Sequence, residues 1–371
     1  DNYTEKGFPI IDLLNRTGLD VSVIGNHEFD YGQNILSDRI SQANFPFVCA
    51  NFSGGEGALS NVKGYEIIKK DGFSIAYIGA VETGNFGRYP LTHPKKVKGL
   101  FFTNPVQVFE NYEMINENPE IDLVIALTHL GKSGDEKILE NFNYIDLVIG
   151  GHSNHIYGEK YKNGYMIMSG KNLEMISKTT MSVYEGKIID FLFEKIDLSN
   201  EGLEKDQNIE LLIQKYKDSP SLYKKIGYSS VNHTKGETGC FYTKAIRETT
   251  NVDIVIQNNG GIRNNLKKGI IRPIDIYTID PFGNGLDNFL ITPVELNFFL
   301  KKYSKRYYIS SRLYIEKKNN GNIEFYRNGR KIGEDEKISL AMNDYISNTY
   351  SKYLPEPLYS YPFTTAEYLI K

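Results

Sequence analysis

Three of the six histidines in this chain stand where short apolar runs end. His27, His129 and His152 each follow a run of apolar residues, and Asn26 and Asn154 lie beside two of them. Neutral imidazoles and amide oxygens are good ligands for Zn²⁺, Mn²⁺ and similar ions. A single histidine after a strand is more often a structural residue, but the three together predict metal-assisted hydrolysis of a phosphate ester.

The segment around His27 carries the densest group of these residues. Its sequence is Gly-Asn-His-Glu-Phe-Asp-Tyr-Gly over residues 25–32, directly after the apolar run at 21–24. Such a run is typical of a buried strand, and Gly25 permits a sharp turn at the strand's carboxyl end. Because ligands bind at this edge of open α/β sheets, we expect the chemistry of the chain there.

The elements that must position these residues alternate along the first half of the chain. Apolar runs typical of strands cover residues 21–24, 47–50, 74–79, 123–128, 147–150 and 166–169. Helical spacing is found at residues 7–15, 105–116 and 135–142. A hairpin is expected around Glu185 and Gly186, between residues 179–184 and 188–194. The alternation predicts an α/β domain over residues 1–198.

The second half of the chain predicts a separate domain. Residues 199–225 are highly charged, with a helix at 208–217, and we interpret them as a solvated linker. Residues 226–371 follow with a helix at 241–248, a buried strand at 254–256, a glycine-rich turn and a last helix at 364–370. This order predicts a second α/β domain.

Composition narrows the classes of partner. The chain has 371 residues, a net charge of −3 and 24% charged residues. Charge spread in this way argues against binding to a nucleic acid polymer, which needs a basic face, but small anionic substrates stay open because local charge decides them. Cys49 and Cys240 are far apart in the sequence, so we expect no disulfide and no cysteine-rich metal site. No apolar run approaches the length of a transmembrane helix.

Motifs in both halves resemble those of one enzyme family. Residues 26–28 (Asn-His-Glu), 128–129 (Thr-His) and 151–154 (Gly-His-Ser-Asn) are similar, in order and spacing, to the motifs of the calcineurin-like metallophosphoesterases. Residues 257–263 (Gln-Asn-Asn-Gly-Gly-Ile-Arg) and 280–284 (Asp-Pro-Phe-Gly-Asn) resemble the C-terminal domain of the 5′-nucleotidase branch. The resemblance implies a four-layer α-β-β-α metallophosphoesterase domain followed by an α/β nucleotide-specificity domain.

The same resemblance implies a metal site in the first domain. Asn26, His129 and His152 would bind one of two divalent ions, Zn²⁺, Mn²⁺ or similar, and Asn154 would serve the other. Amide oxygens and neutral imidazoles suit these ions.

It also implies a catalytic pair. His27 would not bind metal but would stabilise the charge that develops on the phosphoryl group or the leaving oxygen. Asp30 would orient this imidazole and favour its protonated form. The alternative for Asp30 is a carboxylate that satisfies amides at a helix N-terminus.

Residues of the second domain would bind the nucleotide. Arg263 would contact the phosphate through its planar fork, and Asn258 would assist it near the base or the phosphate. Phe282 and Tyr345 would stack on the base, although core packing is the alternative for each aromatic ring. The substrate-binding set that the resemblance implies is Asn258, Gly260, Arg263, Phe282, Asn284 and Tyr345.

Two departures from the family pattern stand out. Family members begin with an Asp-x-His strand and a Gly-Asp pair that supply further metal ligands; this sequence contains neither before its first expected helix, so we expect an upstream segment. Asp1 lies too close to that helix to replace the bridging carboxylate. The family's Gly-Gly-Asp-Gly segment, whose acid grips the ribose, is replaced by Asn-Thr-Tyr-Ser-Lys at residues 348–352.

The expected function is metal-dependent hydrolysis of nucleoside 5′-monophosphates or related nucleotides in an interdomain cleft. Two alternatives remain open: a nucleotide-sugar or cyclic-nucleotide phosphodiesterase on the same scaffold, and a non-catalytic nucleotide-binding relative. The resemblance implies export to the periplasm or cell surface. It predicts no oligomeric state.

Overall fold

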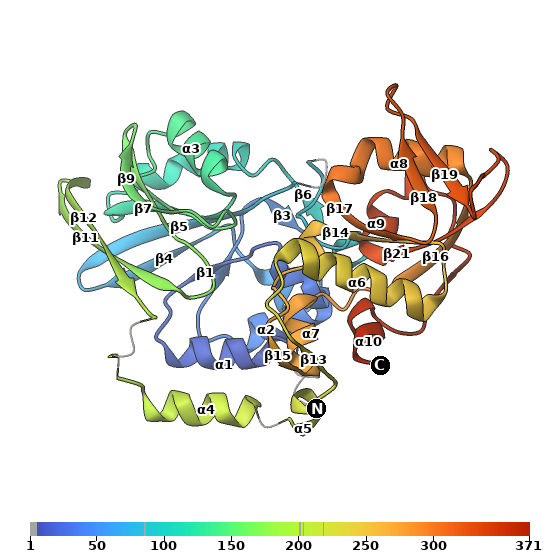
Figure 1. Cartoon of the computed structure of the whole chain (residues 1–371). Coiled ribbons are helices and arrows are strands. Elements are labelled where there is room, and N and C mark those ends of the chain that lie inside the picture. Colours follow the sequence, from blue (N-terminus) through green and yellow to red (C-terminus); the bar gives the residue numbers. More distant parts are fainter. Residues whose placement is uncertain (1–5, 85–86, 200–201, 203, 218) are drawn as a thin grey trace. The chain divides into compact units, whose positions relative to one another are not determined.

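The computed structural model describes residues 6–84, 87–199, 202, 204–217 and 219–371 (Figure 1). Asp1 lies outside the described residues. The chain divides into two compact units, residues 1–218 and 219–371. The division falls inside the segment 199–225 that we interpret as a linker.

Unit 1 is built on a six-stranded sheet with the order β4-β5-β7-β8-β10-β9. The middle strands β5, β7, β8 and β10 are parallel, while β4 and β9 pair antiparallel at the edges. The bounds are β4 (Tyr65–Lys70), β5 (Phe73–Val81), β7 (Leu123–His129), β8 (Leu147–Ile149), β9 (Ile156–Tyr161) and β10 (Gly164–Ser169). The apolar runs that predict four of these strands are buried because both faces of the sheet are covered.

Helices cover one face of this sheet. The helix α3 (Lys132–Asn141) and the 3-10 helix η5 (Gln107–Glu117) pack on it through a shared apolar cluster (Figure 1). The segment 105–116 is therefore helical as predicted, but it is a 3-10 helix. Phe109, Tyr112 and Ile115 explain the tighter winding: they recur every third residue and all belong to the cluster, which matches three residues per turn.

Strands cover the other face. The predicted hairpin forms as β11 (Met175–Tyr184) and β12 (Lys187–Asp197), joined by Glu185 and Gly186 at φ 47° and 69°. Its inward residues pack on the sheet, with the rings of Phe191 and Tyr165 stacked at 4.3 Å. The parallel pair β1 (Ser22–Val23) and β2 (Phe47–Val48) contacts β5 and β7.

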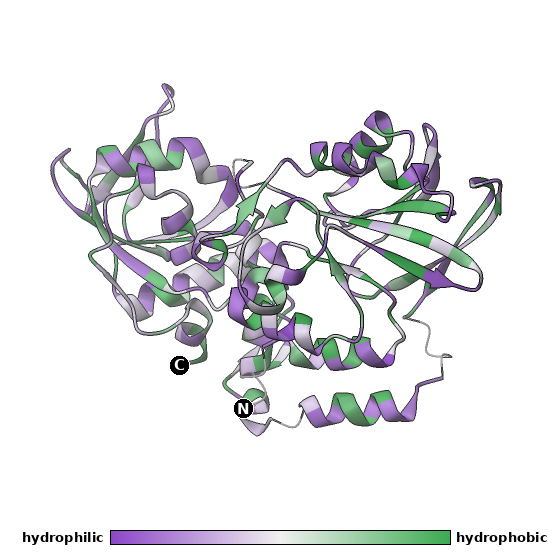
Figure 2. Cartoon of the chain, turned by 180° about the vertical axis from the view of Figure 1, so that it is seen from behind, coloured by the Kyte–Doolittle hydropathy of each residue, from purple (hydrophilic) through white to green (hydrophobic). Residues whose placement is uncertain are grey.

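Helices α1 (Phe8–Arg16) and α2 (Gln33–Gln42) complete unit 1. They pack on β2 and the end of β5 through an apolar cluster that includes Ile11 and Leu36, so the layers run helix, sheet, strands, helix. The charged segment after residue 198 forms α4 (Gln207–Lys217), which lies against α1. Tyr216 makes this contact: its hydroxyl donates to Asp12 at 2.7 Å and its ring meets Phe8. Both helices carry hydrophilic and hydrophobic residues (Figure 2).

Unit 2 is built on a five-stranded sheet with the order β17-β14-β21-β16-β22. Its bounds are β14 (Ile254–Asn258), β16 (Leu286–Ile291), β17 (Tyr307–Ser311), β21 (Ile338–Asn343) and β22 (Tyr359–Ser360). One apolar cluster joins the sheet to α6 (Lys235–Thr250), α7 (Pro273–Ile279) and α10 (Thr365–Ile370). Another joins it to α8 (Pro293–Tyr303), α9 (Asp344–Thr349) and the three-stranded sheet of β18 (Tyr314–Lys317), β19 (Ile323–Arg327) and β20 (Arg330–Lys331).

The remaining elements are short. They are η2 (His27–Tyr31), β3 (Phe52–Ser53), η3 (Gly57–Asn61), η4 (Pro94–Val97), β6 (Phe101–Phe102), α5 (Pro220–Tyr223), β13 (Gly227–Ser229), η6 (Asn259–Gly261), β15 (Gly269–Ile271), η7 (Ser304–Arg306) and η8 (Ser351–Tyr353). Among the described residues, no helix is both long and apolar enough to cross a membrane. Both cysteines are free: Cys49 is buried, which raises the pKa of its thiol to about 12, and Cys240 is exposed on α6.

The close contact between β2 and β5 generates a first prediction. A Cβ at Gly79 would overlap the carbonyl oxygen of Val48, and backbone cannot move aside as a flexible side chain can. Gly79→Ala is therefore expected to lower the free energy of unfolding by about 2 kcal/mol, the cost of overpacking a core. Chemical denaturation followed by circular dichroism measures it. Gly236→Ala, where the nearest atom is 3.9 Å away, should cost nothing, and equal effects of the two changes would contradict the explanation.

Candidate active site

The structure brings the predicted residues of the first unit to one edge of its sheet. Asn26 and His27 follow β1, His129 is the last residue of β7, and His152 follows β8. Strands β7 and β8 are parallel neighbours, and β1 contacts β7. The carboxyl ends of these strands therefore meet, as expected for a ligand site in an α/β sheet.

Two hydrogen bonds fix the orientation of the Asn26 amide. Its oxygen lies 2.9 Å from Nε2 of His129, and its nitrogen donates to the carbonyl oxygen of Leu91 at 3.0 Å. The side chain is buried, with 3% of the residue exposed. Because the nitrogen is bonded to Leu91, the amide oxygen is the atom directed at the imidazole.

The imidazole of His129 is held in its neutral form. Burial is the main cause, and the nearby His152 and His27 add to it, so that the pKa of His129 is lowered to about 4. The rings of His129 and His152 are 5.1 Å apart and meet edge to face at 73°. A neutral imidazole has one ring nitrogen with a free lone pair, which is what a metal ion needs.

Backbone geometry allows these rings to approach closely. A Cβ at Gly25 would lie 3.0 Å from the ring of His129, and a Cβ at Gly151 would lie 3.1 Å from its Nδ1. His152 itself adopts a left-handed conformation with φ 74°. Such strain in a residue other than glycine is concentrated at functional sites, because the surrounding structure must hold it in place.

His27 and Asp30 form the second part of the site. Nδ1 of His27 lies 2.9 Å from Oδ2 of Asp30, within the 3-10 helix η2. Their side chains are 39% and 20% exposed, so the pair faces solvent. The bond connects the carboxylate to the imidazole, which supports the orienting role predicted for Asp30.

One residue beneath the site was not predicted from the sequence. Asp135, in the first turn of α3, is 0% exposed and accepts hydrogen bonds from Thr128 Oγ1 at 2.5 Å and Tyr157 Oη at 3.2 Å. A Cβ at Gly150 would collide with the same carboxylate. Burial raises the pKa of Asp135 to about 7. Asp135 thus connects the end of β7, the end of β8 and the start of β9, the segments that carry His129 and His152.

The donor set fits a divalent ion, with one limit. Asn26, His129 and His152 supply an amide oxygen and imidazole nitrogens in one place, a set suited to Zn²⁺ or Mn²⁺. Asn154 is exposed in the loop after His152, and its side chain forms no hydrogen bond with the residues that the structure describes. Within those same residues, no group of three or more histidines, cysteines, aspartates or glutamates could hold a metal ion. The residues therefore fit one ion better than two.

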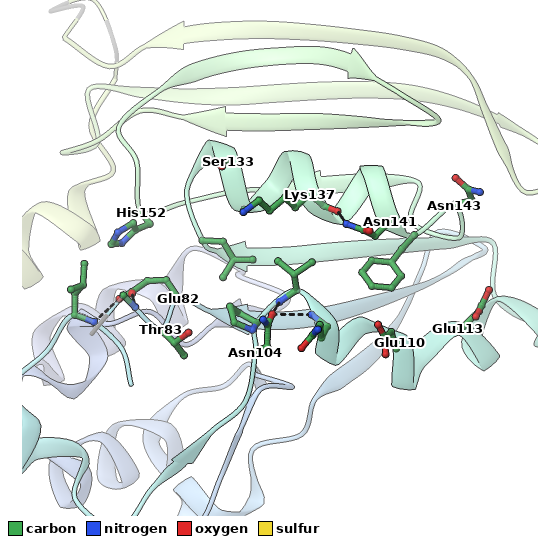
Figure 3. Close-up of a pocket in the computed structure, with 18 residues that line it drawn as sticks. Glu82, Thr83, Asn104, Glu110, Glu113, Ser133, Lys137, Asn141, Asn143 and His152 are labelled. Carbon is green, nitrogen blue, oxygen red and sulfur yellow. Dashed lines mark hydrogen bonds between the residues drawn. The ribbon is translucent and has the colours of Figure 1, made fainter. Parts of the chain in front are cut away.

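A cavity of about 980 Å³ opens beside His152. Figure 3 shows His152 at one end and Asn143 at the other. The walls of this cavity come from η5, α3 and the segment around Glu82. The Glu82 carboxylate accepts hydrogen bonds from the backbone amides of Leu91 and Gly84. The polar side chains of the lining are those of Glu82, Thr83, Asn104, Gln107, Glu110, Glu113, Ser133, Lys137, Asn141, Asn143 and His152. This space lies entirely within unit 1.

In unit 2 the predicted substrate loop follows β14. Asn258 ends that strand, and its amide oxygen accepts a hydrogen bond from Asn343, at the end of the parallel strand β21, at 2.8 Å. Gly261 is needed here because a Cβ would lie 2.8 Å from that same oxygen. Gly260 is exposed at the tip of the turn. The loop is thus anchored to the neighbouring strand.

Arg263 and Phe282 meet on this loop. The guanidinium of Arg263 lies 5.8 Å from the centre of the Phe282 ring, a cation–π distance. The backbone amide of Arg263 donates to the carbonyl oxygen of Ile279 at 2.7 Å, which places the two segments side by side. Asp280 supports the second segment: this buried carboxylate accepts from the hydroxyls of Tyr242 and Thr365, both at 2.5 Å.

The remaining predicted residues of unit 2 lie nearby in the fold. Tyr345 is half-buried on α9 and packs against the core cluster of unit 2, so its ring has a structural role in addition to any role in stacking. Asn284 is buried, and its carbonyl oxygen accepts from the amide of Thr365 at 2.9 Å. The substrate roles of both stay predictions.

Family models match both units. The model of the calcineurin-like phosphoesterases matches residues 6–155, and that of the 5′-nucleotidase C-terminal domain matches residues 218–354. The chain belongs to the 5′-nucleotidase family. The predicted resemblance of the two halves of the chain to these two domains is thereby confirmed, and so is the predicted α/β fold.

Curated relatives agree with this assignment. Endonuclease YhcR of Bacillus subtilis is 25% identical over 94% of this chain and 32% of that protein. Trifunctional nucleotide phosphoesterase protein YfkN of the same organism is 25% identical over 77% of this chain and 23% of that protein. The snake venom 5′-nucleotidase of Crotalus adamanteus is 24% identical over 76% of this chain and 56% of that protein. The chain thus spans less than two thirds of the length of each.

Solved structures show the same fold. A 5′-nucleotidase precursor from Thermus thermophilus superposes with a TM-score of 0.83 at 19% identity, over 99% of this chain and 83% of that one. The 5′-nucleotidase of Candida albicans superposes with a TM-score of 0.68 at 14% identity, over 97% of this chain and 84% of that one.

The buried Asp135 of this family member generates a pH prediction. Its pKa is about 7 in the folded state against 3.8 for an ordinary aspartate, so between about pH 4 and pH 7 the folded protein holds a proton that the unfolded chain has lost. The contribution of Asp135 to the free energy of unfolding must therefore fall as the pH rises through this window.

Asp135→Asn removes this dependence while keeping an amide that bonds to both hydroxyls. The stability of the variant relative to the unmodified protein is expected to rise between pH 4 and pH 7 by about 4 kcal/mol, since the pKa is raised from 3.8 to about 7 and one pKa unit corresponds to about 1.4 kcal/mol. Urea denaturation at a series of pH values measures it. The exposed Asp38→Asn is the control. A pH-independent difference for Asp135→Asn would contradict the prediction.

Proposed function

We propose that this chain is the metal-dependent phosphoesterase portion of a protein that hydrolyses the phosphate ester of nucleoside 5′-monophosphates or related nucleotides. The observation that carries the proposal is the meeting of Asn26, His129 and His152 beside the His27–Asp30 pair at one sheet edge. Membership of the 5′-nucleotidase family supports it.

Unit 1 would supply the reaction site. Asn26, His129 and His152 would hold a divalent ion, Zn²⁺, Mn²⁺ or similar, and the bound ion would polarise the phosphate and lower the pKa of water. His27 would donate a hydrogen bond or a proton toward the phosphoryl oxygens or the leaving oxygen, with Asp30 fixing the ring through Nδ1. Asn154 would serve a second ion.

Unit 2 would supply the nucleotide site. Arg263 would pair with phosphate oxygens, and its position over Phe282 restricts the orientation of its guanidinium. Phe282 and Tyr345 would stack on the base, with Asn258, Gly260 and Asn284 shaping the pocket. We propose that the two units act on one substrate.

The compartment is also a proposal. Resemblance to the family, which includes a snake venom 5′-nucleotidase, favours export to the periplasm or the cell surface.

The cavity beside His152 favours a second candidate, a nucleotide-sugar phosphodiesterase, over the cyclic-nucleotide phosphodiesterase that is the other alternative on this scaffold. Its amide, hydroxyl and carboxylate groups would suit a hydroxyl-rich leaving group, and there is room for one in about 980 Å³. A nucleotide-binding protein without catalysis is the third candidate. Binding of nucleotides without release of phosphate would identify it.

The first functional prediction concerns His27. With added Mn²⁺, the chain is expected to release phosphate from a panel of 5′-nucleotides, and His27→Ala should lower kcat by about 100-fold or more because a general acid and charge-stabilising group is lost. A colorimetric phosphate assay measures it. His233→Ala, which removes a histidine bonded to Ser229 in unit 2, is the matched control. Equal rates for His27→Ala and the control would contradict the catalytic role proposed for His27.

The second functional prediction concerns Arg263. Arg263→Ala is expected to raise KM for a 5′-nucleotide by about tenfold to 100-fold, the value of one charge-assisted contact, with kcat less affected. Arg263→Lys should recover only part of the loss because an ammonium cannot pair with two oxygens in one plane. Arg312→Ala, whose side chain bonds to Asn251 instead, serves as control. Steady-state kinetics with an unchanged KM would remove Arg263 from the nucleotide site.

A further inference from the structure

A second cationic group lies on unit 2, built around the Tyr353 side chain. Nζ of Lys302 lies 3.2 Å from the Tyr353 hydroxyl and 4.4 Å from the centre of its ring. Nζ of Lys352 lies 4.6 Å from the same ring centre. Two ammonium groups thus converge on one phenol, and Lys302 is 51 residues from Tyr353 in the sequence.

Both ammonium groups act on the Tyr353 hydroxyl. Hydrogen bonds from Lys352 and Lys302 lower the pKa of Tyr353 to about 8. The groups that act on Lys302 are the phenols of Tyr353 and Tyr303, and no ion pair joins Lys302 to a carboxylate among the described residues. The exposed residues Lys305 and Arg306 follow a few positions later in the sequence.

Aromatic rings accompany these charges. Phe298 is 53% exposed, and its ring lies 5.8 Å from that of Tyr353 at 44°. The ring of Tyr303 lies 6.0 Å from Tyr353. Ammonium groups beside an exposed aromatic face are the combination that binds a phosphate next to a base or sugar.

Two segments of the chain connect this cationic group to the proposed nucleotide loop. Strand β17 begins at Tyr307, which pairs with Asn258, and the preceding 3-10 helix η7 lies directly beside that loop. The side chain of Asn259 donates to the carbonyl oxygen of Lys305 at 3.4 Å. On the other side, α9 with Tyr345 leads directly into η8 with Lys352 and Tyr353. Both segments therefore run from the nucleotide residues to the cationic group.

We propose that Lys302, Lys352 and Tyr353 form a subsite for a second phosphate, carried on the sugar of a nucleotide held at Asn258, Arg263 and Phe282. The inference rests on the proposed function and extends it to a substrate class: nucleotides with two separate phosphates. The second phosphate is either a terminal monoester, as in a nucleoside 3′,5′-bisphosphate, or a diester that leads to the next nucleotide.

The sequence around Lys352 supports this substrate class. The segment 348–352 contains no acidic residue, and it carries a lysine directly before Tyr353. An acid in this place would repel a phosphate on the sugar, whereas an ammonium attracts it. The short helix η8 therefore suits a phosphorylated sugar better than a free diol.

Equilibrium binding to the full chain tests the subsite without relying on turnover. Isothermal titration calorimetry in the absence of added metal would compare a nucleoside 5′-monophosphate, the matching 3′,5′-bisphosphate and a 5′-phosphorylated dinucleotide. At least one of the two larger ligands is expected to bind about tenfold tighter than the monophosphate, the value of one charge-assisted contact. The advantage should shrink in high salt. Whichever larger ligand shows it identifies the source of the second phosphate.

The Lys302→Gln/Lys352→Gln double variant should abolish this advantage and leave the affinity for the monophosphate unchanged. Lys301→Gln is the matched control, because the Lys301 ammonium is directed to Asn322 on another segment. Thermal melting confirms that each variant folds. The subsite is overturned if neither larger ligand binds tighter, if no ligand binds, or if the double variant keeps the advantage. Lysine-dependent binding without phosphate release in the separate Mn²⁺ assay would overturn only the proposed hydrolysis.

Discussion

The buried carboxyl group of Asp135 is the interaction on which the site of unit 1 depends. It is bonded to Thr128, one residue before His129, and to Tyr157, while Gly150 leaves the space that it occupies. Hydrogen bonds to a carboxyl group in a water-free environment fix direction as well as distance. The three segments that carry or follow the imidazoles are therefore held to one another from below, and the left-handed backbone at His152 can be maintained.

In unit 2 a buried carboxyl group likewise holds the segments of the proposed nucleotide site in place. Asp280 is fully buried and accepts from a tyrosine and a threonine, Tyr242 and Thr365, which come from helices on either side of it in the sequence. The segment that it supports carries Phe282, which meets Arg263. In both units the exposed polar residues are arranged by a buried carboxyl group that cannot itself touch a substrate. A polar group of this kind specifies one arrangement of the surrounding backbone, because every alternative leaves it without partners.

The sequence predicted the parts of this structure that depend on local pattern. Apolar runs located the strands β5, β7, β8, β10 and β14, and the position of the histidines directly after such runs placed them at one edge. It did not predict the role of Asp135, since an aspartate in the first turn of a helix is common and only the fold shows Thr128, Gly150 and Tyr157 around it. The convergence of Lys302 and Lys352 on Tyr353 was equally hidden, because no local pattern connects Lys302 with a segment so far away in the sequence.

The difference between the two thiols has a practical consequence. Cys49 is buried and its thiol stays protonated at ordinary pH, whereas Cys240 is exposed on α6. The thiolate of an accessible cysteine is the nucleophile that attacks a thiol-reactive dye. A maleimide fluorophore would therefore attach to Cys240 alone, without any prior mutation. A single added cysteine on unit 1 would then provide a donor and acceptor pair, and energy transfer between them would report the distance between the units in solution and how it changes when nucleotide is added.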